Sequence, residues 1–288
     1  MPESTRDNTR QGIWLAIAAV CFFSTSPILV LWAAPLSPFE ITAGRLASGA
    51  LAVWLLARLN GQPLLSRRPD LPRFFGFGLI TALHFLCYIA SLSFTTIAHS
   101  LAIVYTAPIF VTLFSATMLG EPIPRRKWLG VIVAVAGIAI LAGLEPRLNT
   151  RMIIGDLLAL GSAVTFGLYS VAGRSQRERY GLFTYAGTVY GLAALWMLPF
   201  AALSFTPAGY QSRSLLAVLG AGLLPLGVGH TLYNAALRRI HATTVNLIAM
   251  QEVTGGVLLG ALLLSQIPQV NEIAGAVVAL IGIALVMV

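Results

Sequence analysis

The sequence predicts an all-α polytopic membrane protein, with ten transmembrane helices arranged as two inverted five-helix repeats. Composition is the first observation behind this prediction: 57% of the 288 residues are hydrophobic and 10% are charged, whereas soluble domains carry about 25% charged residues. The second is that the apolar residues fall in runs of about 20, the length with which a helix crosses roughly 30 Å of hydrocarbon. The third is an internal repeat. These runs do not alternate in polarity, as strands of a membrane barrel do.

Ten apolar runs, each bounded by charge, proline or glycine, define the expected helices in chain order. They are 11–31, 39–59, 72–93, 97–119, 128–144, 153–173, 181–203, 214–237, 241–264 and 271–288. The polar residues 1–10 precede them as a tail. We expect the first run to stay in the protein, because it lacks the small-residue cleavage site of a signal peptide.

Positive charge is distributed unevenly between the connections. Fourteen of the 18 basic residues lie in the tail and in alternate loops, against three, Arg147, Arg151 and Arg213, on the opposite side. Because cytoplasmic loops carry the excess of Lys and Arg, both termini are predicted to face the cytoplasm. The net charge of +8 then reflects orientation, so the expected partners are membrane lipid and a small-molecule substrate, not nucleic acid.

The chain aligns with itself when it is shifted by about half its length. A shift of 145 residues places Tyr88 on Tyr233 and Gly137 on Gly282, and a shift of 143 places Phe23 on Phe166. A unit of five spans must enter the membrane upside down the second time. The expected organisation is therefore a tail 1–10, a first repeat 11–144, a linker 145–152 and a second repeat 153–288, which is a construction of secondary transporters. With both repeats in one chain, a monomer suffices.

Three short stretches carry a family resemblance. They are Tyr105-Thr106-Ala107-Pro108, then Leu119-Gly120-Glu121 before the basic turn Arg125-Arg126-Lys127, and the run from Gly130 to Leu141. Together with the 5+5 pattern they resemble the EamA-type members of the drug/metabolite transporter superfamily, most closely the bacterial aromatic amino-acid exporters. The second half departs from the pattern, with Ser265-Gln266 where Gly120-Glu121 would repeat and Glu252-Val253 where Glu-Pro is common. The resemblance implies a bacterial inner-membrane exporter or facilitator of small metabolites, amino acids being a frequent substrate class.

A candidate site follows from interruptions in matching helices, since irregular backbone survives at membrane depth only beside a cavity or inside protein. Pro108 interrupts the run 97–119, and Gly255-Gly256 lies at the equivalent part of 241–264. The alternative is a kink that serves packing alone. Glu252 lies near the middle of its run, where a carboxylate costs about 2.5 kcal/mol or more. It could carry a proton, oppose a substrate ammonium, or accept a structural hydrogen bond from a Tyr or His.

Polar and aromatic side chains at helical spacing extend this site. His84, Tyr88 and Ser91 form one stripe, and His230, Tyr233 and Asn234 form another. The expected cavity-lining residues are His84, Tyr88, Ser91, Tyr105, Pro108, Tyr169, His230, Tyr233, Asn234, Asn246, Met250 and Glu252. For each histidine, a core residue bonded to a neighbouring helix is the alternative.

Two further interpretations concern single residues. Arg45, inside the second run, is expected to snorkel outward and play a structural role. Tyr88 and Tyr233, each about 7 Å inside an opposite surface, are hypothesised to close the outer and inner vestibules in turn, or else to be packing residues inherited by the repeat.

The sequence argues against catalysis. No His-Glu-x-x-His, Gly-x-Ser-x-Gly or Gly-x4-Gly-Lys pattern occurs, and Cys21 and Cys87 lie in apolar runs without metal-ligand spacing. No enzyme activity, cofactor or metal is expected. The function predicted is secondary transport of small metabolites by alternating access, with amino acids, including aromatic and neutral ones, as the expected substrates. The alternatives are export of other metabolites or drugs, and a passive pore or scaffold.

Overall fold

The computed structural model describes residues 3–95, 97–120, 124–142, 149–264 and 270–287. Helices make up most of these ranges and no strand occurs in them, so the all-helical prediction is confirmed. Glu121, Ser265-Gln266 and the first half of the expected linker 145–152 lie outside the described ranges. The helix expected from 153 begins earlier, at Thr150, where the Asn149 side chain accepts a hydrogen bond from the Met152 amide and caps it.

The elements follow one another in the order of the sequence runs. The first half holds α1 (Glu3–Phe23), α2 (Ser26–Trp32), α3 (Pro38–Leu59), η1 (Arg68–Asp70), α4 (Leu71–Phe94), α5 (Ile97–Val104), α6 (Ala107–Met118) and α7 (Arg125–Ala142). The second half holds α8 (Thr150–Ser175), α9 (Leu182–Leu203), η2 (Pro207–Gly209), α10 (Ser212–Ala221), the π-helical η3 (Gly222–His230), α11 (Thr231–Leu237), α12 (Ala242–Ala249), α13 (Glu252–Leu264) and α14 (Val270–Met287).

Seven helical stretches in the described ranges are long and apolar enough to cross a membrane. They are Asn8–Trp32, Pro38–Leu59, Arg68–Phe94, Thr150–Ser175, Leu182–Leu203, Ser212–Leu237 and Ala242–Leu263. Three shorter apolar helices, Ala107–Met118, Lys127–Gly137 and Ile273–Gly282, accompany them. The chain is a multi-pass membrane protein. Fewer than ten stretches satisfy the length criterion, in part because α5 and α6, with 8 and 12 residues, divide one expected span into two short pieces.

Large apolar side chains cover the outside of the bundle. On α9, Leu195, Leu198 and Leu203 are exposed, and on α13 so are Leu258 and Leu262. In water such a surface would be an aggregation hazard. In a bilayer it faces hydrocarbon, which is what the composition requires.

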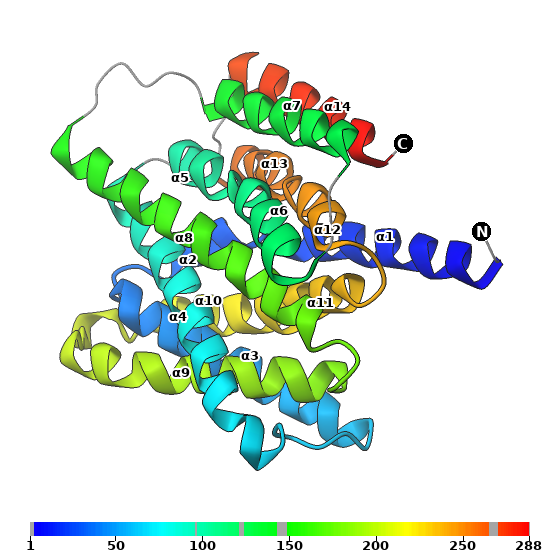
Figure 1. Ribbon diagram of the computed structural model, residues 1–288. Coiled ribbons are helices and arrows are strands. Elements are labelled where there is room, and N and C mark those ends of the chain that lie inside the picture. Colours follow the sequence, from blue (N-terminus) through cyan, green and yellow to red (C-terminus); the bar gives the residue numbers. More distant parts are fainter. Residues whose placement is uncertain (1–2, 96, 121–123, 143–148, 265–269, 288) are drawn as a thin grey trace.

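Helices from the two halves pack against each other in pairs. α3 packs on α9, α4 on α8, and α7 on α14 (Figure 1). Small residues make these approaches close: a Cβ added to Gly187 or Gly191 of α9 would lie 2.5 Å from the Trp54 ring of α3. The small-residue spacing Gly187-x3-Gly191 thus places α9 against α3.

Two of the expected spans are broken at equivalent places. α5 ends at Val104 and α6 begins at Ala107, while α12 ends at Ala249 and α13 begins at Glu252. The intervening pairs, Tyr105-Thr106 and Met250-Gln251, are separated by 145 residues, which is the offset of the repeat. Pro108 accounts for the first break, because it lacks an amide hydrogen and its ring collides with the carbonyl four residues earlier, that of Val104.

The loops that carry most of the positive charge gather at one end of the bundle. Asp70 pairs with Arg179 at 2.8 Å, and Arg238 donates to the carbonyl of Arg177 at 2.8 Å. The first turn of α1 and the last turn of α14 lie toward this same end (Figure 1). Which compartment this end faces stays a prediction.

Candidate functional site

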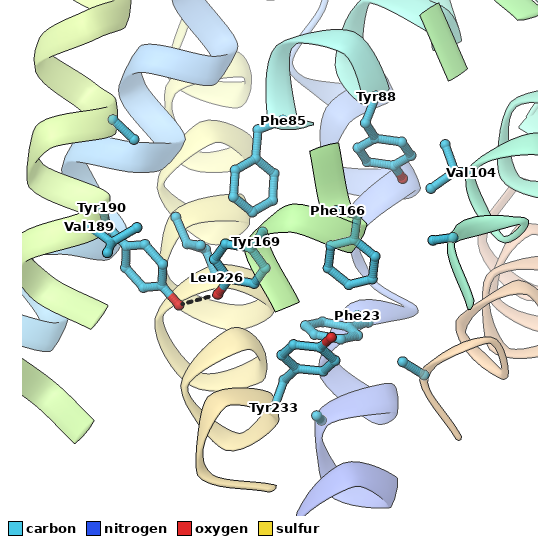
Figure 2. Packing of buried hydrophobic residues seen from close by; sticks show 14 of the residues in the cluster. Phe23, Phe85, Tyr88, Val104, Phe166, Tyr169, Val189, Tyr190, Leu226 and Tyr233 are labelled. Carbon is cyan, nitrogen blue, oxygen red and sulfur yellow. Dashed lines mark hydrogen bonds between the residues drawn. The ribbon is translucent and has the colours of Figure 1, made fainter. Parts of the chain in front are cut away.

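A small cavity lies among the helices of both halves. Its volume is about 30 Å³, comparable to the share of liquid volume of one water. The residues that line it are Phe23, Ser26, Arg45, His84, Phe85, Tyr88, Leu101, Val104, Tyr105, Phe166, His230 and Glu252. Phe23, Phe85 and Phe166 point into this region from α1, α4 and α8 (Figure 2). The wall of the cavity is therefore rich in rings and carries two charged side chains.

Arg45 is one of the two charged residues, and its position corrects the expectation that it snorkels outward. Its exposed fraction is 2%. Its Nη1 donates to the Ser26 hydroxyl at 2.9 Å, and its guanidinium lies 4.5 Å from the centre of the Phe85 ring. The Arg45 side chain therefore turns inward, toward Ser26 of α2 and Phe85 of α4, and not toward lipid.

Glu252 is the other charged residue. It is the first residue of α13, and a helix N-terminus favours a negative charge through its free amide groups. The Tyr105 hydroxyl donates a hydrogen bond to its carboxylate. Since Tyr105 lies in the break between α5 and α6, the two broken helices meet at this bond. Glu252 thus has the structural bond that was one of its three possible roles, and it also lines the cavity.

The two histidines lie in the cavity wall with different partners. The His84 Nδ1 lies 3.0 Å from the Ser162 hydroxyl, and the His84 ring stacks on Phe166 with centroids 4.7 Å apart. His230 packs against Phe23 at 4.5 Å, and its Nδ1 is buried without a hydrogen-bond partner in the described ranges. His230 ends η3, where Pro225 removes an amide donor and the wide π turn results.

The remaining candidates do not line this cavity. Four of the polar ones, Tyr169, Tyr233, Asn234 and Asn246, join with Ser170 and Tyr190 in a buried cluster that we call the Tyr–Asn network. Its hydrogen bonds form two adjacent groups of three, Tyr169–Tyr190–Asn234 and Ser170–Tyr233–Asn246. The Asn234 amide donates to Tyr169 at 2.7 Å, and the Asn246 amide donates to Tyr233 at 2.7 Å. The network ties α8, α9, α11 and α12 together beside the cavity, and Tyr169, Tyr190 and Tyr233 are labelled in Figure 2.

Three further candidates lie at helix contacts or helix ends. Ser91 of α4 shares a 2.5 Å hydrogen bond with Ser100 of α5. Pro108 is buried in the first turn of α6, and Met250 is buried in the break before α13. The sequence reasoning did not assign Arg45, Ser26 or Phe85 to the site. Arg45 could have been assigned from the sequence, because an arginine inside an apolar run is itself a sign of a functional site.

The described residues hold no group of His, Cys, Asp and Glu that could bind a metal ion. The model of the EamA-like transporter family matches residues 10–143 and again residues 153–288. The chain belongs to the EamA-like transporter family. Membership confirms the resemblance and points to a membrane transporter of small molecules rather than an enzyme.

Similar proteins include named exporters. This EamA-like transporter is 29% identical over 278 residues to a pseudopaline exporter, CntI, of Pseudomonas aeruginosa strain UCBPP-PA14, covering 96% of this chain and 95% of the relative. It is 27% identical over 231 residues to the aromatic amino acid exporter YddG of Ancylobacter novellus, covering 78% and 79%. A solved crystal structure superposes with a TM-score of 0.79 over 95% of both chains, at 21% identity, which shows a shared fold.

Proposed function

We propose that this EamA-like transporter moves small organic metabolites, above all amino acids including neutral and aromatic ones, out across a bacterial inner membrane by alternating access. The observation that carries the proposal is the small cavity between the two halves, at which both broken helices end. Discontinuous helices that meet at a central site are a construction of secondary transporters. At about 30 Å³ the cavity must widen to admit a metabolite, as a site in a closed state does.

We further infer ten spans in two inverted repeats, 11–144 and 153–288, with the tail 1–10 and the C-terminus in the cytoplasm. Two features support this. The breaks in the fourth and ninth spans match under the 145-residue offset. The contact of α4 with α8 has a counterpart in the contact of η3 and α11 with α1, as a two-fold relation between the halves requires.

The character of the wall supports amino acids as the substrate class. The rings of Phe85 and Phe166 suit neutral and aromatic side chains, and the wall carries both a cation and an anion. The relatives named above export an aromatic amino acid and pseudopaline. Of the predicted site residues, we propose that His84, Tyr88, Tyr105, His230 and Glu252 face the substrate directly.

Transport by purified protein in proteoliposomes tests the proposal. We expect saturable exchange of radiolabelled neutral amino acids, reduced in His84→Ala and Tyr88→Ala, with stability changed by no more than about 1–2 kcal/mol. Leu262→Ala, which alters an exposed side chain of α13, is the control and should transport normally. Unsaturable passage of any small solute would indicate a pore, and the absence of exchange for every amino acid would contradict the substrate class.

A further inference from the structure

We propose that Arg45 and Glu252 form a charge clamp for a zwitterion: the guanidinium binds the carboxylate of one substrate molecule and the Glu252 carboxylate binds its ammonium group. The inference rests on the proposed transport function and assigns the recognition step within it. Specificity then resides first in the two charges that all amino acids share, and the aromatic wall selects among side chains.

The guanidinium has unused hydrogen-bonding capacity at the cavity. Its Nη1 is engaged by Ser26, but its Nε is buried and has no hydrogen-bond partner among the described residues. Arginine grips a carboxylate with two parallel N–H bonds from one edge of its planar fork. Ser26 and the Phe85 ring hold one edge and one face of Arg45, which leaves the Nε edge for a ligand.

Other buried atoms of the same wall are also unsatisfied. The Tyr88 hydroxyl makes no hydrogen bond of ordinary geometry within the described ranges, and neither does the His230 Nδ1. Buried polar groups are nearly always paired in native proteins. Three orphaned polar atoms around one cavity indicate a place where a polar ligand completes the bonding.

The two charges lie in the wall of one cavity but do not form an ion pair with each other in the described residues. Arg45 and Glu252 line the same cavity and interact electrostatically, yet the ion pairs found among the described residues do not include them. A buried cation and a buried anion held apart each lack a full counter-charge, and a molecule carrying both opposite charges supplies them together. A zwitterion is the simplest such molecule.

The charges also depart from the internal repeat. The 143-residue offset places Arg45 on Thr188, and the 145-residue offset places Glu252 on Ala107. Neither charge therefore has a counterpart in the other half. Each half contributes one charge of opposite sign, which suits a ligand with two different ends in a fixed orientation.

Three probes that differ only in their charges test the clamp in proteoliposomes. L-phenylalanine carries both charges, phenethylamine only the ammonium, and 3-phenylpropionate only the carboxylate; L-leucine with isoamylamine and 4-methylpentanoate forms a second set. We expect the wild type to prefer the zwitterions. Glu252→Gln should weaken competition by the amino acids roughly thirtyfold or more while sparing 3-phenylpropionate, and Arg45→Gln should do so while sparing phenethylamine.

Matched surface changes serve as controls. Arg151→Gln removes an arginine that also lies near a ring, that of Phe94, and Glu178→Gln removes an exposed acid; both should leave competition by all six probes unchanged. If Arg45→Gln does not fold, Arg45→Lys keeps the charge without the fork and should weaken the zwitterion and the carboxylate probe alike.

Two outcomes would overturn the clamp. One is equal losses for all three charge types in both variants. The other is a wild type that accepts singly charged analogues as well as the amino acid. In either case amino-acid exchange by the wild type would leave the transport function standing. A wild type that carries no amino acid would instead contradict the proposed substrate class, whatever the variants do.

Discussion

Asp70 connects two loops at the charged end of the bundle through one carboxylate. It accepts a hydrogen bond from the Tyr180 hydroxyl and pairs with Arg179 at 2.8 Å. Burial, together with the bond to Asp70, raises the pKa of Tyr180. The carboxylate therefore holds the loop before α9 against the start of α4.

This arrangement predicts an alkaline pH dependence. Because the pKa of Tyr180 is higher in the folded state, its stabilising contribution is complete below about pH 10, the ordinary pKa of tyrosine, and is lost as the pH rises through the folded-state value. Tyr180→Phe should be about 1–2 kcal/mol less stable than wild type at pH 7. The difference in thermal unfolding between the two proteins should shrink above pH 10, and a difference that stays constant to pH 11.5 would refute the assignment.

Glu252 and Arg45, the two charged residues of the cavity wall, show which features of a buried charge can be predicted from sequence. The cost of burying a carboxylate marks Glu252 as a candidate functional residue without any structure. Arg45 carries the same signal, but its distance from a helix end suggested snorkelling. Depth along a helix can be counted from the sequence, whereas rotation about the helix axis depends on which neighbours it packs against. In the structure α3 packs against α9, η3 and α4, and with this rotation Arg45 reaches Ser26 of α2.

Helix packing supplies a prediction at the contact of α7 with α14. A Cβ added to Gly282 would lie 2.3 Å from the backbone N and 2.6 Å from the Cα of Ala134. Backbone cannot move aside without separating the helices, so Gly282→Ala should destabilise the protein by about 1–3 kcal/mol. Gly76→Ala in α4 is the control, because nothing lies within 4 Å of the added atom. It should be neutral or stabilise by up to about 1 kcal/mol, as thermal unfolding in detergent would show.

The broken helices were only half predictable. Pro108 announces the first break, and α5 does end at the carbonyl its ring would strike. The second break has no proline, and it falls at Met250-Gln251, four residues before Gly255. Propensity alone could not place it, but the repeat could, since Tyr105-Thr106 maps onto it at the 145-residue offset. The internal repeat therefore locates the second break, which the local sequence does not mark.

The Tyr–Asn network predicts a gate at the end of α11. Leu92 and Leu237 follow Tyr88 and Tyr233 by four residues and are equivalent in the repeat. If the network holds the inner side closed, Asn246→Ala removes one of the two hydrogen bonds that hold the Tyr233 hydroxyl and shifts the population toward the inward-open state. In a background lacking Cys21 and Cys87, a thiol reagent should then modify Leu237→Cys faster and Leu92→Cys more slowly. Parallel changes at both positions would rule out this gate.

At the scale of the molecule, the clustering of charged loops predicts the orientation. Leu65→Cys, Pro124→Cys and Glu178→Cys place thiols at exposed positions near Arg68, Arg126 and Arg177. A membrane-impermeant reagent added to intact cells should leave all three unmodified and should modify Gln211→Cys, an exposed position in an opposite loop. Labelling of any of the first three in sealed cells would reverse the topology.

The fold class followed from composition and run length, because hydrocarbon permits few solutions for an apolar chain. The pairing of α3 with α9 and of α7 with α14 did not, since apolar faces of similar composition can pack in many combinations. The size of the cavity could not be predicted from the sequence either. It depends on how far rings such as Phe23 and Phe166 fill the space between helices, and that is a property of packed side chains.

The π-helical turn of η3 has no counterpart in the first half, where the equivalent residues 77–85 are regular α-helix in α4. Two identical halves would give inward-open and outward-open forms of equal energy. An irregular turn in one half makes these energies unequal, so one form is the resting majority. The smaller the fraction of molecules whose site is open to one face, the weaker the apparent affinity for substrate on that face. The substrate concentration that gives half-maximal transport should therefore differ between the two faces of the membrane. The final gradient should be unaffected, because it is fixed by the driving force, but the protein should respond to lower substrate concentrations on one face than on the other.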